Sequence, residues 1–211
     1  MTRPSSLQSF IEAAAIAFER AAPSAHARSV LRGVFERLSL EPRDTETTVA
    51  DRSGEPVGKP PVCGLLPRIY ASVDETHPLS SLIASFEQLE PCLVWQRAID
   101  TNGTGSADFR DGHADVMIVG PRGYEARSDV WLGASLLAPH VRYPDHKHAP
   151  QEVYLVASDG EFQHGDSDWF SPGPGGSFYN SPNIKHAMRA GEDPLFAFWA
   201  LLPSSKQSDH S

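Results

Sequence analysis

The sequence predicts a mainly β protein with a helical N-terminal region. Apolar residues recur every three to four positions in the first hundred residues, which indicates amphipathic helices. After Thr101 the apolar segments become short and β-prone, and turns rich in glycine and proline separate them, as in a small antiparallel barrel. We expect residues 1–100 to form a helical region that packs on a barrel of residues 101–203. Residues 204–211 are expected to form a flexible tail.

About three helices are expected before the barrel. Their apolar faces are Leu7, Phe10, Ile11, Ala14 and Phe18 in the first, Val30, Leu31, Val34, Phe35 and Leu38 in the second, and Leu79, Leu82, Ile83, Phe86 and Leu89 in the third. Ser6 and Ser24 are the expected N-caps, and the third helix is expected to end before Pro91. Residues 41–61 are polar and broken by proline and glycine, so they are expected to form a connection.

Five segments in the second half are expected to form strands. They are residues 116–119, 130–137, 153–157, 161–164 and 195–202. The last of these is the longest unbroken apolar run in the chain and is too short to cross a bilayer as a helix.

The charge balance disfavours two classes of partner. The chain has 18 Lys and Arg against 27 Asp and Glu, a formal net charge of −9, and no local basic cluster offsets it. Binding to nucleic acid or to an anionic membrane is therefore not expected. The N-terminus lacks the basic and apolar segments of a secretory signal, so a cytoplasmic protein is expected. In that compartment Cys63 and Cys92 are expected to be free and buried.

A cluster of metal-binding residue types lies in the barrel half. His146 and His148 alternate in the sequence, as do Glu152 and Tyr154, so each pair is expected on one side of an extended segment. His186 would close the site from a neighbouring strand. Imidazole, carboxylate and phenolate donors suit a divalent transition metal, namely zinc, iron, manganese, cobalt or nickel.

The same residues resemble a known family. His-x-His-x-x-x-Glu at 146–152 resembles the first cupin motif, and Gly176, Pro182 and His186 have the spacing of the second. Longer stretches resemble the cupin-type dimethylsulfoniopropionate (DMSP) lyases of marine bacteria; these are residues 138–146, 152–156, 178–189 and 194–199. Tyr154 is part of this narrower resemblance, because a tyrosine two residues after the glutamate is not part of the general cupin pattern. The resemblance implies a double-stranded β-helix, which is a jelly-roll-like barrel.

The resemblance also implies an activity and roles for individual residues. The activity is metal-dependent cleavage of DMSP, a small zwitterion, to dimethyl sulfide and acrylate by β-elimination. The implied metal ligands are His148, Glu152, His186 and Tyr154. Tyr154, at or beside the metal, would act as the general base, and Tyr143 and His146 would flank the substrate. His146 is also open as a fourth ligand, and either a monomer or a homodimer is compatible with the sequence.

Aromatic faces suit a sulfonium cation, which makes no strong hydrogen bonds. The aromatic residues available in the barrel half include Tyr143, Phe178, Tyr179, Trp131, Trp169 and Trp199. Two alternatives to the lyase remain open at this point. One is a different metal-dependent cupin enzyme, a dioxygenase or an isomerase, and the other is a non-enzymatic cupin binding protein. Tyr154 favours the lyase over an oxygen-activating enzyme, which has no need of a phenolate beside its metal.

Overall fold

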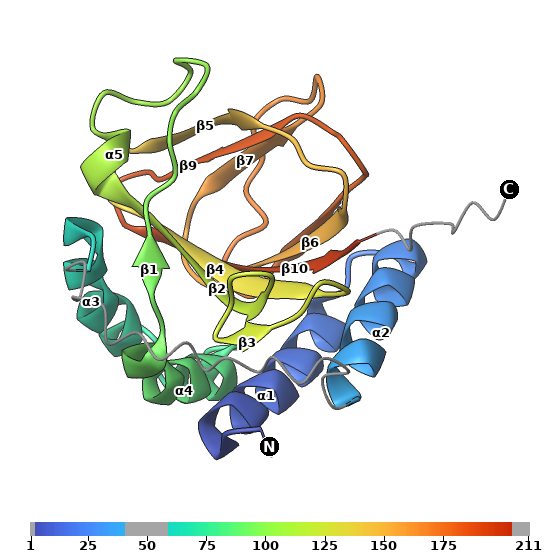
Figure 1. The fold of residues 1–211 in the computed structure, drawn as a ribbon. Coiled ribbons are helices and arrows are strands. Elements are labelled where there is room, and N and C mark those ends of the chain that lie inside the picture. The colour runs from blue at the N-terminus through green and yellow to red at the C-terminus, as the bar shows by residue number, and fades with distance from the viewer. Residues whose placement is uncertain (1–2, 41–58, 204–211) are drawn as a thin grey trace, which may run out of the picture.

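The computed structural model describes residues 3–40 and 59–203, which form two facing β-sheets and a layer of helices (Figure 1). The helices are α1 (Ser5–Ala21), α2 (Ala25–Ser39), α3 (Leu66–Ala71), α4 (Ser80–Leu89) and α5 (Phe109–Gly112), with 3-10 turns η1 (Pro61–Leu65) and η2 (Glu90–Cys92). The strands are β1 (Trp95–Gln96), β2 (His113–Gly120), β3 (Glu125–Ala126), β4 (Trp131–Leu137), β5 (Arg142–His146), β6 (Gln151–Val156), β7 (Glu161–His164), β8 (Ser177–Asn180), β9 (His186–Arg189) and β10 (Leu195–Leu202). None of the described helices combines the length and the apolar character needed to cross a membrane.

The two sheets have the cupin arrangement expected from the sequence. The larger sheet has the strand order β1-β2-β4-β10-β6-β8, with β3 beside β2, and the smaller has the order β5-β9-β7. Every pairing is antiparallel except that of β2 with β3. The sheets face each other but remain separate hydrogen-bonded units, so the barrel is not fully closed (Figure 1). The expectation of a mainly β cupin preceded by helices is confirmed.

Strand β10 explains why the longest apolar run lies at residues 195–202. Successive side chains of a strand point to opposite faces. Phe196 and Phe198 belong to the core shared with the helices, whereas Trp199 and Leu201 belong to the core between the sheets. Because both faces of β10 are covered, every position in it is apolar. In Figure 1, α1, α2 and α4 lie on the side of the larger sheet that faces away from the smaller one.

The three expected helices correspond to α1, α2 and α4, with one correction to the capping. The Ser24 side chain caps α2 by accepting a hydrogen bond from Ala27 N–H at 3.1 Å, as expected. Ser6 does not cap α1, because that helix already begins at Ser5 and the Gln8 N–H donates to the Pro4 carbonyl. Helix α3 was not expected; it has only six residues, too few to show a helical period.

The expected strands all lie within or overlap observed strands, but several others were missed. Residues 161–164 and 195–202 coincide with β7 and β10, and the remaining three correspond to β2, β4 and β6. The five strand candidates did not include β5, β8 or β9, whose side chains are largely polar or aromatic. Extended backbone was expected at His146 and at His186 only from the arrangement of the candidate site, and these residues lie at the ends of β5 and β9. Strand β1 also joins the larger sheet, ahead of Thr101. The division at about residue 100 stays a prediction, and the flexible tail at 204–211 and most of the 41–61 connection lie outside the described residues.

Both cysteines are free, but only one is buried. Cys63 lies in η1 and is buried, as expected. Cys92 is exposed at the end of η2, so the expectation of two buried thiols is wrong for this residue. Cys92 is the last residue of η2, and the buried side chain of that turn is Glu90 instead.

Candidate metal and substrate site

A cavity of about 170 Å³ lies between the two sheets and contains most of the residues singled out in the sequence. Tyr143, His146, His148, Glu152 and Tyr154 all line it. Glu152 and Tyr154 are on β6 and share a face through the alternation of the strand, as predicted. His148 lies in the loop between β5 and β6, not on a strand, yet it faces the same cavity.

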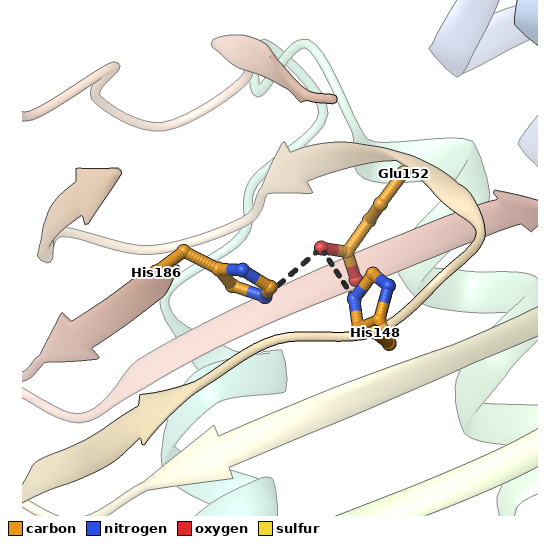
Figure 2. A group of neighbouring side chains, drawn as sticks. All are labelled: His148, Glu152 and His186. Carbon is orange, nitrogen blue, oxygen red and sulfur yellow. Dashed lines mark hydrogen bonds and ion pairs between the residues drawn. The ribbon is translucent and has the colours of Figure 1, made fainter. Parts of the chain in front are cut away.

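His148, Glu152 and His186 form a compact group, which we call the His-Glu-His cluster (Figure 2). One potential ligand atom from each residue lies within 4.8 Å of the other two. Nε2 of His148 and Nε2 of His186 each lie 3.3 Å from Oε2 of Glu152. The structure does not bring His146 into this group, although its ring centroid is 4.0 Å from that of His186.

A tight turn between β8 and β9 holds the start of β9, with His186, beside the loop that carries His148. Pro182 and Asn183 occupy the centre of a turn closed by a hydrogen bond from Ile184 N–H to the Ser181 carbonyl at 3.2 Å. Asn183 has φ of 59°, a left-handed conformation that asparagine tolerates better than most residues. Its N–H then donates to the His148 carbonyl at 2.8 Å, which places the start of β9 beside the loop that carries His148.

Backbone carbonyls fix the orientation of all three histidine rings. Nδ1 of His146, His148 and His186 lies 2.9–3.1 Å from a carbonyl oxygen two residues away. The carbonyls are those of Pro144, Pro150 and Ile184. In a neutral ring, such a bond places the proton on Nδ1 and leaves Nε2 available to a metal. Nε2 of His186 is buried and has no hydrogen-bond partner, which suits a metal ligand.

Charge and burial act in opposite directions at the cluster. Burial acts to raise the pKa of the Glu152 carboxyl. The hydrogen bond from His148 and the Coulomb interaction with the nearby His186 outweigh burial and hold this pKa below its usual value. Burial lowers the pKa of His186 to about 4. Burial also acts to lower the pKa of His148, but the hydrogen bond to Glu152 and the charge of that carboxylate raise it overall. The cluster therefore presents an ionised carboxylate and a neutral His186, both ready to bind a cation.

Tyr154 is held rigidly next to the cluster. Its ring stacks on that of Phe178, with centroids 5.0 Å apart and an interplanar angle of 8°. The two residues are direct cross-strand partners on β6 and β8. Burial, followed by the charge of Glu152, raises the pKa of the Tyr154 phenol well above its usual value, so without a metal the group is protonated.

Asn180 and His164 contact the cluster, and the sequence analysis assigned neither of them a role. Asn180 is fully buried, and its Nδ2 donates to Oε2 of Glu152 at 3.1 Å. Its Oδ1 lies 2.9 Å from Nδ1 of His164, a bond that sets which way the amide points. Asn180 pairs with Glu152 across β6 and β8. The contact between Asn180 and Glu152 follows from the pairing of β8 with β6, and the sequence did not predict β8.

Asp115 is a second carboxylate in the cavity that the sequence analysis missed. It is on β2, where its Oδ1 accepts a hydrogen bond from Ser135 Oγ and lies 3.1 Å from Nε2 of His113. Tyr143 OH lies 3.4 Å from Oδ2. His113 was given no role, yet it is fully buried. The sequence signal that could have identified Asp115 is the alternation of side chains along β2, which places Asp115 and Met117 on the cavity side.

Only part of the proposed aromatic set reaches the cavity. Tyr143, Trp131 and Trp199 line it. Trp169 instead packs against Arg189, whose guanidinium carbon is 4.3 Å from the centre of the indole ring. Tyr179 points to another face and contacts the ring of His26 with centroids 4.8 Å apart.

Comparisons with known proteins agree with this geometry. A chain from the crystal structures of the DMSP lyases RdDddP and RnDddQII has a TM-score of 0.65 and 21% identity, and the match covers 97% of this chain and 96% of that chain. The DMSP lyase DddQ from Ruegeria pomeroyi DSS-3 has a TM-score of 0.64 and 18% identity, and the match covers 98% of this chain and 95% of that chain. At these identities the likeness shows a common fold.

The family is established by sequence. No curated protein shows significant similarity to the chain. A family model described as dimethylsulfoniopropionate lyase, however, matches residues 28–197, which is most of the sequence and includes both halves of the site. The chain therefore belongs to the dimethylsulfoniopropionate lyase family and is a lyase.

Proposed function

We propose that the protein cleaves DMSP to dimethyl sulfide and acrylate at the His-Glu-His cluster, with Tyr154 as the general base. The observation that carries this proposal is that Tyr154 lines the same cavity as His148 and Glu152 of the cluster, in a member of this family. Tyr143 and His146 line the same cavity and are proposed to flank the substrate.

The reaction removes a proton from the carbon next to the substrate carboxylate. We infer that the Tyr154 oxygen accepts this proton. The electron pair of the broken C–H bond forms the new double bond, and the C–S bond breaks with its electron pair leaving on sulfur. The products are acrylate and neutral dimethyl sulfide, and Tyr154 is left as a phenol. The stacked ring of Phe178 keeps the base in place during this transfer.

A divalent metal is proposed as the cofactor, held by His148, Glu152 and His186, with Tyr154 at or beside it. When bound, zinc, iron, manganese, cobalt or nickel would act as a Lewis acid on the substrate carboxylate and would favour the phenolate form of Tyr154. The donor set contains no thiolate, so it accepts several of these metals. The unpartnered Nε2 of His186 and the ionised Glu152 support this assignment.

Release of dimethyl sulfide tests the proposed reaction. Purified protein is incubated with DMSP, and the headspace is analysed with and without a chelator, alongside metal analysis of the protein. We expect dimethyl sulfide from metal-loaded protein and its loss after chelation. Metal-loaded protein that binds DMSP but releases no dimethyl sulfide would favour the binding-protein alternative. Consumption of oxygen, or isomerisation of a sugar instead, would favour a different cupin enzyme.

Tyr154→Phe tests the base. We expect kcat to fall at least about 100-fold, the usual contribution of a positioned general base, while the metal content changes little. Tyr179→Phe is the matched control, because it removes the same hydroxyl from the same sheet but away from the cavity. Activity of Tyr154→Phe close to that of the unaltered protein would exclude the residue as the base.

The remaining expectations belong to the same proposal. We propose a cytoplasmic enzyme that acts as a monomer or homodimer on a small zwitterion. The net charge of −9 supports the absence of nucleic-acid and membrane partners.

A further inference from the structure

The cavity contains one charged group that the proposed reaction leaves unused. Asp115 and Glu152 are the acidic residues of its lining, and among the described residues no lysine or arginine lines it. Glu152 is directed at His148 and His186. The negative charge of Asp115 is therefore available to a ligand.

Asp115 keeps this charge because the groups around it favour the ionised form of its carboxyl. Burial acts to raise the pKa of its carboxyl, but His113, Ser135 and His146 outweigh burial and keep the pKa below its usual value. Nδ1 of His113 accepts a hydrogen bond from Ala98 N–H at 3.5 Å, and Nε2 of the same ring lies 3.1 Å from Oδ1 of Asp115. The hydroxyl groups of Ser135 and Tyr143 orient the carboxylate and bring no charge of their own.

The partners also fix where the charge lies. Trp199 Nε1 donates to Ser135 Oγ at 3.1 Å, and that hydroxyl bonds to Asp115. The Asp115 side chain nevertheless keeps 28% of its surface accessible, so a ligand in the cavity can reach it. Trp131 and Trp199 line the same cavity. A fixed anion beside indole rings suits a cation that cannot donate hydrogen bonds.

We propose that Asp115, together with Trp131 and Trp199, forms the subsite that binds the dimethylsulfonium group of the substrate. The substrate carboxylate then lies toward the His-Glu-His cluster. This inference rests on the proposed function for the identity of the substrate. It assigns Asp115 to substrate recognition, in particular to the choice of a cation over a neutral group of the same shape.

Two unreactive carboxylates of similar shape test the subsite. 3-(Trimethylammonio)propanoate carries a positive charge where DMSP has its sulfonium, and 4-methylpentanoate carries a neutral branched carbon there. Their dissociation constants are measured by calorimetry on the metal-loaded protein. We expect the unaltered protein to prefer the cation by at least about tenfold. Equal binding of the two probes by the unaltered protein would overturn the proposal, whatever the variants do.

Asp115→Asn assigns the preference to this residue. The substitution keeps the shape of the side chain and removes its charge, so we expect the preference to disappear while 4-methylpentanoate binds as before. Asp111→Asn is the control; it makes the same change at an exposed carboxylate that does not line the cavity. Equal weakening of both probes by Asp115→Asn would mean that the residue only supports the fold, and would overturn the proposal.

Turnover of DMSP separates this inference from the proposed function. A sulfonium loses its charge as the C–S bond breaks, so Asp115 binds the substrate more strongly than the transition state. We expect Asp115→Asn to raise KM at least about tenfold and to change kcat less. A charge preference that depends on Asp115 in a protein that releases no dimethyl sulfide would support the subsite and contradict the proposed function. Release of dimethyl sulfide by a protein without a charge preference would support the proposed function and contradict the subsite.

Discussion

Asn180 orients the only carboxylate of the His-Glu-His cluster. Its Nδ2 donates to Oε2 of Glu152, and His164 sets the direction of its amide. We predict that Asn180→Leu weakens metal binding about 10- to 100-fold, as is usual when a group that orients a metal ligand is lost. The measurement is a competition titration against a chelating dye.

The control for this variant is Gln163→Leu. It removes a partly buried amide whose Nε2 donates to the Ser167 carbonyl rather than to the cluster. Metal affinity of Asn180→Leu within twofold of the control would show that Asn180 does not orient Glu152.

The sequence predicted the residues of the candidate site better than the groups that contact them. Glu152 and Tyr154 were predicted because both lie on β6, where alternation alone places them on one face. His186 was found through its distance from Pro182. Asn180 and Asp115 could not be found in this way, because their contacts depend on how β8 and β2 pair with their neighbours. Pairing of strands distant in the sequence leaves no local pattern.

Helix α1 is joined to the larger sheet by aromatic contacts. The Phe10 side chain is fully buried, and its ring centroid lies 5.9 Å from that of Phe86 and 5.8 Å from that of Phe198. We predict that Phe10→Ala lowers the free energy of unfolding by about 3–5 kcal/mol, through lost burial and the cavity left behind. Ile16→Ala on the same helix is the control, because Ile16 is 56% exposed and its loss is expected to cost no more than about 0.5 kcal/mol. Similar losses for both variants in denaturant titrations would contradict this packing.

The turns η1 and η2 give the two thiols different reactivities. Burial, followed by the charge of Glu90, raises the pKa of Cys63 from 9.0 to about 12. A raised pKa means less thiolate at any given pH, so at pH 8 we predict that iodoacetamide modifies Cys92 and leaves Cys63 unmodified. Mass spectrometry of the peptides measures this. Denatured protein is the control, in which both thiols are expected to react, and rapid modification of Cys63 in the folded protein would contradict its burial.

Elements were predictable where one physical signal dominated. Helices α1, α2 and α4 each carry one apolar stripe, and β10 carries a long apolar run. Strand β9 begins with the metal-ligand candidate His186, and β5 ends with His146. These polar side chains interrupt the apolar pattern by which a strand is recognised in a sequence. Helix α3 follows η1 directly and shows no period of its own.

The helices and the larger sheet share one hydrophobic core. The core includes Phe10 and Phe86 from the helices and Phe198 from β10. We predict that the protein unfolds in a single transition, in which far-ultraviolet circular dichroism and tryptophan fluorescence change together. Loss of helical signal at a lower denaturant concentration than the change in fluorescence would show that the N-terminal helices unfold separately.

The carbonyl contacts of His146, His148 and His186 also bear on how the site would acquire the proposed metal ion. The rings adopt their orientations as the chain folds, so the conformational entropy of the side chains is lost before any ion arrives. Capture of the ion then needs little reorganisation. If the proposed metal is bound there, we expect the metal-free protein to stay folded and to take up the ion within the mixing time, with selectivity set by which ions the cell supplies.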